Sequence, residues 1–403
     1  MKTGKIFQGD RIIWVVFFLL SVISLIAVYS SIGLYAYTAF ASKSPTSLFL
    51  RHLLIVVVTY VVVALMSHIN YRYFSRFAML GYWAAIVLLT IMLALNQGRW
   101  MRIPVIGQLQ PSEIAKVVLI IFVARQVSIA KKKQQTEEIG TFLMILVYIA
   151  PVVLLVLPEN FSTAALIFLS AYLVMLYGGV NRKYWWRLFL VGVVVAIGFL
   201  MVSYYKYEKS LNNVGTEMAI ERQATWGHRV YSWWNPEPDE LSQENMAKMA
   251  IARGGFARLG VGSTVHARLM TQAHNDFIYA IIIEETGMIG GLIVFALYSI
   301  FFFRCIKLSL KCKGNFGALT VAGLGTMIYL QALVNMSVAV GVLPVTGQTL
   351  PFISYGGTAY LFLGCGLGVI QSVAADIVKN EQDEKNGVVP TPEEEVEEEP
   401  TEK

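Results

Sequence analysis

The sequence predicts an all-α polytopic membrane protein with about ten transmembrane helices and one large outer-face loop. Two observations lead to this prediction. Hydrophobic residues make up 56% of the 403 residues and charged residues only 14%, whereas a soluble domain carries roughly 25% charged residues. Long apolar runs also recur along the chain, separated by short basic clusters. The length alone would permit several soluble domains, but the hydropathy is decisive and favours a membrane protein.

Ten apolar segments come close to the length of about 20 residues that a helix needs to cross a bilayer. The first could be a secretory signal, but its apolar region at 12–28 is longer than the roughly 7–15 residues of a signal sequence. We therefore expect it to remain as a membrane span. The expected spans are residues 12–33, 48–67, 75–95, 112–129, 139–157, 162–179, 187–205, 277–303, 318–342 and 352–376.

Basic residues are divided unequally between alternate connections. One set holds fifteen Lys and Arg residues, and the other short loops hold four. Since cytoplasmic loops carry an excess of Lys and Arg, we expect the first set and both termini in the cytoplasm. Membrane topology thus explains the net charge of +6, and no nucleic-acid partner is expected. The first set is Lys2, Lys5, Arg11, Arg72, Arg76, Lys131, Lys132, Lys133, Arg182, Lys183, Arg187, Arg304, Lys307, Lys311 and Lys313.

One connection and the C-terminal tail differ from the other loops. Residues 206–276 form an outer connection far longer than about 15 residues, a length beyond which loops are usually functional or disordered. It contains three tryptophans and charges of both signs, so we expect a folded element resting on the membrane. Residues 380–403 are acidic with almost nothing to bury, so we expect a disordered tail. The transmembrane domain is therefore expected at 1–379, loop 206–276 included.

The first polar segment is Gln-Pro-Ser-Glu-Ile-Ala-Lys at 110–116, at the start of the fourth span. Ser112 can cap this helix, with Pro111 just outside it. Glu113 and Lys116 are three residues apart and so share a helix face. Ionisable residues inside a bilayer are costly and are candidates for function. The pair could be a plain intrahelical ion pair, or Lys116 could hold phosphate beside a polar cavity.

The second segment runs from His274-Asn275-Asp276 into Glu284-Glu285. Asp276 lies where the long outer connection enters the eighth span, and Glu284 lies about two turns deeper. Desolvation at an apolar boundary raises the pKa of a carboxylate, which suits a general base. A helix-capping aspartate explains Asp276 equally well.

The third segment, at 346–357, contains Pro351 and a pair of glycines, which break a regular helix, and also Ser354. Irregular backbone at membrane depth persists only where protein or a water-filled cavity satisfies it. The segment is therefore expected to line an outer-face cavity. Close helix packing through its small residues is the competing explanation.

Cysteines and histidines show no metal-binding or disulfide pattern. The three cysteines, Cys305, Cys312 and Cys365, have no repeating spacing. His266, His274 and Asp276 lie close in sequence and could hold a metal, but scattered polar loop residues explain them more simply. Metal ligands are left unassigned.

Together these segments resemble the SEDS family (shape, elongation, division and sporulation), whose members include FtsW and RodA. QPSEIAK is similar to the family's Q-P-S-E-x-x-K stretch, HNDFIYAIIIEETG to its H-T-D-F-I-F-A…E-E-x-G segment, and TGQTLPFISYGGTA to T-G-x-T-L-P-F-I-S-Y-G-G-S-S. The third segment, with Gly98-Arg99-Trp100, looks more like FtsW, the division member. Thr271-Gln272 stands where the family has Pro-Glu, and the segment 158–163 is one residue longer than the family's P-D-F-G-T.

The resemblance implies a peptidoglycan glycosyltransferase of cell division in the bacterial cytoplasmic (inner) membrane. It would polymerise lipid II at the outer face and release undecaprenyl diphosphate. The implied partners are lipid II and undecaprenyl-linked glycan, a class B penicillin-binding protein and other divisome proteins. No cofactor is certain; a divalent cation, Mg²⁺ or Mn²⁺, is the candidate.

The matching motifs imply Asp276 as the catalytic base and Lys116 as the important lysine. Asp276 would deprotonate the acceptor 4-hydroxyl, which would attack the anomeric carbon with inversion. The diphosphate leaving group needs positive charge, expected from Lys116. The full set expected at the substrate is Lys116, Glu113, Arg102, Arg253, His274, Glu284 and Ser354.

Two other function classes fit the sequence. A lipid II flippase would use the same headgroup contacts but needs alternating access, and the sequence shows no clear internal repeat of the kind many transporters have. A noncatalytic divisome scaffold would tolerate changes at Asp276 and Lys116.

Overall fold

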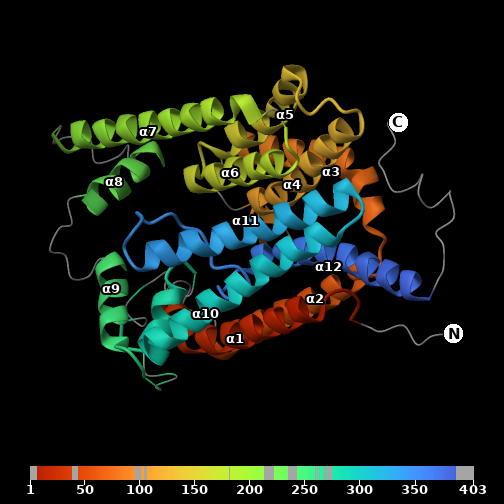
Figure 1. Ribbon diagram of the computed structural model, residues 1–403. Coiled ribbons are helices and arrows are strands. Elements are labelled where there is room, and N and C mark those ends of the chain that lie inside the picture. Colours follow the sequence, from red (N-terminus) through yellow and green to blue (C-terminus); the bar gives the residue numbers. More distant parts are fainter. Residues whose placement is uncertain are drawn as a thin grey trace.

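Ten long helices form the body of the protein in the computed structural model (Figure 1). The structure describes residues 7–38, 44–95, 101–103, 107–180, 182–212, 222–234, 243–258, 260, 262, 264–266, 270 and 275–386. The long helices are α1 (Arg11–Thr38), α2 (Pro45–Ser67), α3 (Tyr71–Ala94), α4 (Pro111–Lys132), α5 (Ile139–Val156), α6 (Phe161–Tyr177), α7 (Arg182–Asn212), α10 (Ile278–Lys311), α11 (Asn315–Ala339) and α12 (Gly357–Lys385).

Each expected span coincides with one of these helices, and the fold class is confirmed. Within the described residues, eight helices are long and apolar enough to cross a membrane: α1, α2, α3, α5, α7, α10, α11 and α12. The apolar helix α6 is shorter, with 17 residues. Helix α4 is less apolar, but it packs against α3, α5, α6, α11 and α12. Because protein rather than lipid surrounds it, α4 tolerates polar residues that a lipid-facing helix would not.

The long connection between α7 and α10 contains two further helices. Helix α7 continues beyond the expected span to Asn212, followed by α8 (Arg222–Trp234) and α9 (Gln243–Gly254). Figure 1 shows α8 and α9 at the end of the bundle opposite the two chain termini. Trp233 Nε1 of α8 donates to the Gly341 carbonyl at 3.2 Å, and Arg229 donates to the Val345 carbonyl at 3.1 Å. These contacts hold α8 against the segment that follows α11.

A short hairpin departs from the purely helical expectation. Strand β1 (Met101–Ile103) pairs antiparallel with β2 (Gly107–Leu109) just before α4. Backbone groups of a connection outside a helix need partners of their own, and strand pairing supplies them here.

The start of the predicted disordered tail is helical, so this boundary is wrong. Helix α12 continues to Lys385. Lys311 Nζ lies 2.7 Å from Glu381 Oε1, and Lys313 Nζ lies 2.6 Å from Glu384 Oε1. These two acidic side chains pair with the end of α10 and with the connection that follows it, and the composition of the tail alone did not reveal these partners. Residues 387–403 lie outside the described residues.

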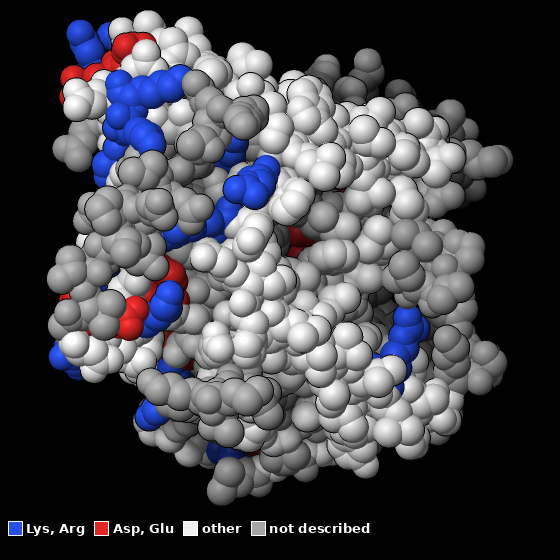
Figure 2. Space-filling view, turned by 90° about the vertical axis from the view of Figure 1, so that its right-hand side faces the viewer, with Lys and Arg blue, Asp and Glu red and all other residues white. Residues whose placement is uncertain are grey.

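Contacts at the same end join the N-terminal segment to α10 and α12. Asp10 Oδ1 accepts from the first amides of α1, and Asp10 Oδ2 accepts from Arg304 Nε at 2.9 Å. The Gln371 side chain accepts from the Asp10 amide at 2.7 Å and donates to the Asp10 carbonyl at 3.2 Å. In Figure 2, which views the bundle from this end, charged side chains gather mainly on one side of the face.

Candidate active site

Helix α4 places two charged side chains inside the bundle. The helix begins at Pro111, with Gln110 at the N-cap and no side-chain cap hydrogen bond. Ser112 therefore lies inside the first turn, and the predicted Ser112 cap is wrong. Proline is favoured at the first helical position because its missing N–H would have no partner there.

The Lys116 ammonium is fully buried and has two polar partners. Its Nζ lies 2.8 Å from Glu113 Oε1 and donates to Gln331 Oε1 of α11, also at 2.8 Å. The exposed fraction is 0% for the Lys116 side chain and 4% for that of Glu113. A buried ion pair of this kind is strongly destabilised when one partner is removed, because the other charge stays buried. Lys116 reaches no solvent here, so direct contact with a ligand requires movement of its neighbours.

Helix α11 joins the three polar segments through two amide side chains. Gln331 and Asn335 are four residues apart, so they share a helix face. Gln331 Nε2 donates to the Thr349 carbonyl at 3.0 Å. Asn335 Nδ2 donates to the Asp276 carbonyl at 3.0 Å and to the Gln348 carbonyl at 2.7 Å. The segments at 110–116, 274–287 and 346–357 therefore meet at this face.

Sequence reasoning missed both of these residues. Gln331 and Asn335 are almost fully buried and lie in a span that is otherwise apolar and rich in glycine. Polar side chains at helical spacing within a membrane span were the signal that could have identified them.

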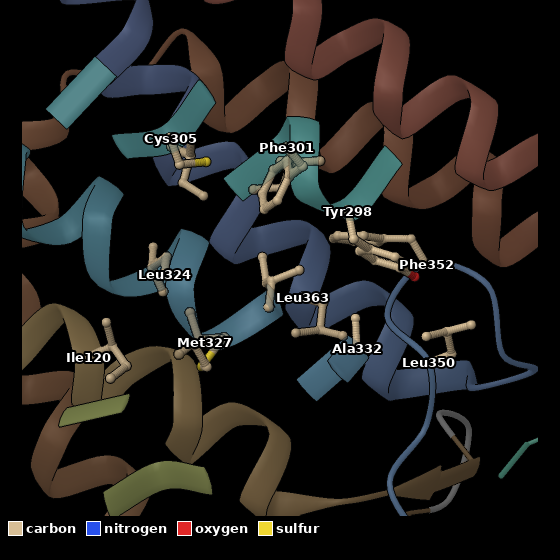
Figure 3. Packing of buried hydrophobic residues seen from close by; sticks show 14 of the residues in the cluster. Ile120, Tyr298, Phe301, Cys305, Leu324, Met327, Ala332, Leu350, Phe352 and Leu363 are labelled. Atoms are coloured by element: carbon tan, nitrogen blue, oxygen red, sulfur yellow. The ribbon is translucent and has the colours of Figure 1, made fainter. Parts of the chain in front are cut away.

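The irregular segment between α11 and α12 is satisfied by side chains of other helices. Beyond the two α11 contacts, Tyr298 of α10 donates to the Pro351 carbonyl, and Ser24 of α1 donates to the Ile353 carbonyl at 2.7 Å. Figure 3 shows Tyr298 lying against Phe352. Phe352 has a φ of 59°, a left-handed conformation that costs energy in a bulky residue. Surrounding protein thus satisfies this broken backbone, and the outer-face cavity that the sequence predicted here stays a prediction.

The start of α6 contacts the same irregular segment. Asn160 caps α6 by accepting from the Thr163 amide at 3.2 Å. Gln348 Nε2 donates to Thr163 Oγ1 at 2.5 Å, and Ser162 Oγ donates to the Thr346 carbonyl at 2.9 Å. The polar residues after α5 therefore fix the first half of this segment.

Asp276 lies two residues before α10 begins, and Figure 1 shows that α10 begins at the end of the bundle where α9 lies. Asp276 is partly exposed, and the N-cap position of α10 is Phe277 instead. Ser354 Oγ donates to the neighbouring Asn275 carbonyl at 2.6 Å. With the Asn335 contact, two consecutive backbone carbonyls are held by side chains from two other elements. The backbone that carries the Asp276 carboxylate is thus fixed on both sides.

Glu284 binds the outer connection. Its Oε1 lies 3.1 Å from Arg253 Nη1 of α9 and 3.1 Å from His266 Nδ1. The same oxygen accepts from the amides of Val265 and His266 at 3.1 and 3.2 Å. The exposed fraction is 1% for the Glu284 side chain and 32% for that of Arg253. This carboxylate therefore ties α9 and the residues after it to α10.

A glycine allows the same connection to approach the α10 backbone. Gly287 has a φ of 72° and interrupts α10. A Cβ there would lie 2.8 Å from Ala257 Cα and from the Phe256 carbonyl oxygen. Across this break the Met288 amide donates to the Gly255 carbonyl at 3.0 Å. The break in α10 is thus paired with the outer connection.

The expected site residues fall into three sets. Glu113 and Lys116 connect through Gln331 to the irregular segment before α12, and Ser354 of that segment holds the backbone next to Asp276. Arg253 and Glu284 form a separate contact on the outer connection. Arg102 lies in β1, but its side chain is outside the described part of the chain, as is His274 entirely. Among the described residues no group of three or more His, Cys, Asp or Glu could hold a metal ion.

Comparison with known proteins identifies relatives over nearly the whole chain. The model of the FtsW, RodA and SpoVE family, described as "Cell cycle protein", matches residues 10–378. The Escherichia coli K12 "Peptidoglycan glycosyltransferase MrdB" is 28% identical over 323 residues, covering 78% of this chain and 82% of that protein. The Trichlorobacter lovleyi "Probable peptidoglycan glycosyltransferase FtsW" is 27% identical over 390 residues, covering 93% of this chain and 96% of that protein.

Solved structures share the fold. One, described as "Structural coordination of polymerization and crosslinking by a peptidoglycan synthase complex", gives a TM-score of 0.66 at 24% identity, covering 92% of this chain and 98% of that chain. The crystal structure of the Thermus thermophilus rod shape determining protein RodA gives a TM-score of 0.62 at 20% identity, covering 91% of this chain and 97% of that chain.

Proposed function

The chain belongs to the FtsW, RodA and SpoVE family of cell cycle proteins, and we propose that it polymerises peptidoglycan glycan strands from lipid II, releasing undecaprenyl diphosphate. The relatives named above are called peptidoglycan glycosyltransferases. The observation that supports this function best is the placement of Asp276. This residue is partly exposed, on backbone that Ser354 and Asn335 hold in place.

In the proposed reaction Asp276 is the general base. Its carboxylate takes the proton of the acceptor 4-hydroxyl as that oxygen attacks the anomeric carbon of the donor sugar. A new carbon–oxygen bond forms, and the bond from the anomeric carbon to the diphosphate oxygen breaks with inversion. The electrons of that broken bond stay with the diphosphate, which leaves as the lipid-linked diphosphate. A base fixed in position lowers the barrier because orientation is already established before the reaction.

The leaving diphosphate requires positive charge in a site that excludes water. Lys116 is the proposed cation, reaching the diphosphate when the substrate replaces its contacts with Glu113 and Gln331. Arg102 and Arg253 are further candidates. Mg²⁺ or Mn²⁺ is the proposed cofactor, because Mg²⁺ is commonly held by one or two carboxylates together with substrate phosphates.

The protein is a multi-pass membrane protein, and we propose the bacterial cytoplasmic membrane with both termini inside. The distribution of Lys and Arg supports this orientation, which puts Asp276 at the outer face, where the growing strand lies. A class B penicillin-binding protein is the proposed partner, with other divisome proteins. Relatives named FtsW and MrdB match at similar identity, so the division role stays a prediction.

A gel assay of glycan strands made from lipid II tests the proposed function. Purified full-length protein, alone and with its cognate transpeptidase, is expected to form polymer. Asp276→Asn should abolish polymer, whereas Asp383→Asn, near the end of α12, should keep it. Polymer at the wild-type rate from Asp276→Asn would refute the assigned base. Translocation of lipid II in vesicles without polymer would favour the flippase, and normal growth with both Asp276→Asn and Lys116→Met would favour the scaffold.

A further inference from the structure

A histidine lies fully buried in α2, within a membrane span. His52 has an exposed fraction of 0%, and its Nε2 lies 2.8 Å from Ser24 Oγ of α1. A polar ring at this depth is costly, so an intramembrane histidine is a candidate for function. The reaction proposed above does not use it.

The hydrogen bonds around Ser24 determine which His52 nitrogen carries the proton. Ser24 Oγ donates to the Ile353 carbonyl at 2.7 Å. A serine hydroxyl has one hydrogen, so Ser24 Oγ can only accept from the histidine. His52 therefore donates through Nε2–H, and its Nδ1 has no hydrogen-bond partner among the described residues.

Two tyrosine rings confine the imidazole. The Tyr355 ring centroid lies 5.5 Å from that of His52, and the Tyr360 ring meets it edge-on at 5.8 Å. The Tyr360 hydroxyl is held by Ser21 Oγ at 2.9 Å. The ring that directs Ser24 is therefore packed in one orientation.

The Ile353 carbonyl belongs to the turn that supports Asp276. The amides of Ile353 and Ser354 donate to the Leu350 carbonyl at 3.2 and 3.0 Å. The Leu350 amide donates to Ser354 Oγ at 2.7 Å, and that hydroxyl donates to the Asn275 carbonyl at 2.6 Å. The left-handed Phe352 lies in the middle of this turn, so the turn needs such contacts to persist.

We propose that His52 is a positioning residue for Asp276, acting through Ser24, the 350–354 turn and the Ser354 hydroxyl. The Nε2–H of His52 directs the Ser24 hydroxyl to Ile353, and the fixed turn aims Ser354 at the residue before Asp276. The role in turnover rests on the proposed function, but the support of the turn does not. A histidine that only packs α1 against α2 would not need its N–H, and this difference can be measured.

The test compares variants of the purified full-length protein in the lipid II assay. His52→Met keeps bulk but removes the donor, and His52→Gln places an amide N–H near the position of Nε2. His52→Met and Ser24→Ala should each lower kcat roughly tenfold or more, because small misplacements of a reacting group are costly, with KM for lipid II little changed. The double variant should be no worse than either single variant, since both break one chain of contacts.

His52→Gln should recover most of the lost turnover. His68→Gln, at the exposed end of the same helix, should behave as wild type and serves as the matched control. Three results would overturn the positioning role. They are wild-type turnover in His52→Met, an equal loss of turnover in the Gln and Met variants, and an additive loss in the double variant.

Hydrogen exchange separates this inference from the proposed function. The amides of Leu350 and of residues 352–354 should exchange faster in His52→Met and Ser24→Ala than in wild type, and should be unchanged in His68→Gln. A wild-type protein that forms no polymer would remove the proposed function but leave this measurement intact. Unchanged exchange at 350–354 in both variants would remove the inference even where polymerisation is confirmed.

Discussion

Asn335 holds the backbone carbonyl of Asp276 at 3.0 Å, and the same amide group reaches the Gln348 carbonyl at 2.7 Å. One side chain of α11 thus links the start of α10 to the irregular segment before α12. The candidate base is carried on backbone whose position depends on the packing of three elements, so residues that never touch substrate should affect turnover.

Replacing Asn335 tests this dependence. Asn335→Asp puts a carboxylate oxygen where the Asn335 amide now donates to two carbonyls, so the oxygens repel one another. The kcat should fall roughly 100-fold, which is the loss expected when a reacting group is misplaced by about 1 Å. Asn335→Ala should fall less, because it adds no repulsion. The lipid II assay measures both, with Asn386→Ala at the exposed end of α12 as the control. Equal activity of the Asp and Ala variants would contradict the argument.

Lys116 has a structural role and a proposed catalytic role, and these can be separated. Lys116→Met leaves the Glu113 carboxylate buried without its cation and should destabilise the protein by about 3–5 kcal/mol. Adding Glu113→Gln removes that charge and should restore most of the thermal stability. Should Lys116 bind diphosphate, the stable double variant stays inactive; recovery of polymerisation would assign the lysine to folding alone. Thermal unfolding in detergent and the gel assay provide the two readouts.

We predict that Glu284 orders the outer connection and contributes less to the glycosyl transfer itself. Glu284→Gln removes the charge that Arg253 and His266 contact, and hydrogen bonds to charged groups contribute roughly 1.5–3 kcal/mol. Exchange of the Val265 and His266 amides should therefore rise while exchange in α11 stays unchanged. Glu384→Gln, at the far end of the bundle, is the control. Exchange at 265–266 that matches wild type would show that the Glu284 contacts do not order this connection.

Gly287 should tolerate no side chain. Gly287→Ala forces a Cβ into the Ala257 and Phe256 backbone at a φ of 72°, and such strain costs roughly 1–3 kcal/mol. Gly198→Ala in α7 meets nothing within 4 Å and should be neutral or stabilising, since alanine favours a helix by about 1 kcal/mol over glycine. Melting temperatures of the two variants check the contrast, and equal values would show that the α10 break is not strained.

The membrane spans were largely predictable because the length and apolarity of a span are local properties. The expected span 139–157 appears as α5 at Ile139–Val156, and 75–95 appears as α3 at Tyr71–Ala94. The broken segment before α12 was also predicted, since proline and paired glycines stop a helix wherever they stand.

The sequence by itself determined the fold class, the order of the spans and the three polar segments. Tertiary structure alone decided how those segments meet. Gln331, Asn335 and His52 lie in largely apolar spans, and their partners come from other helices and from the segments that precede α10 and α12. A buried polar group takes its role from the donor or acceptor that packing brings to it, and no local pattern specifies that partner. The same reason applies to Glu284, whose partners Arg253 and His266 come from the outer connection.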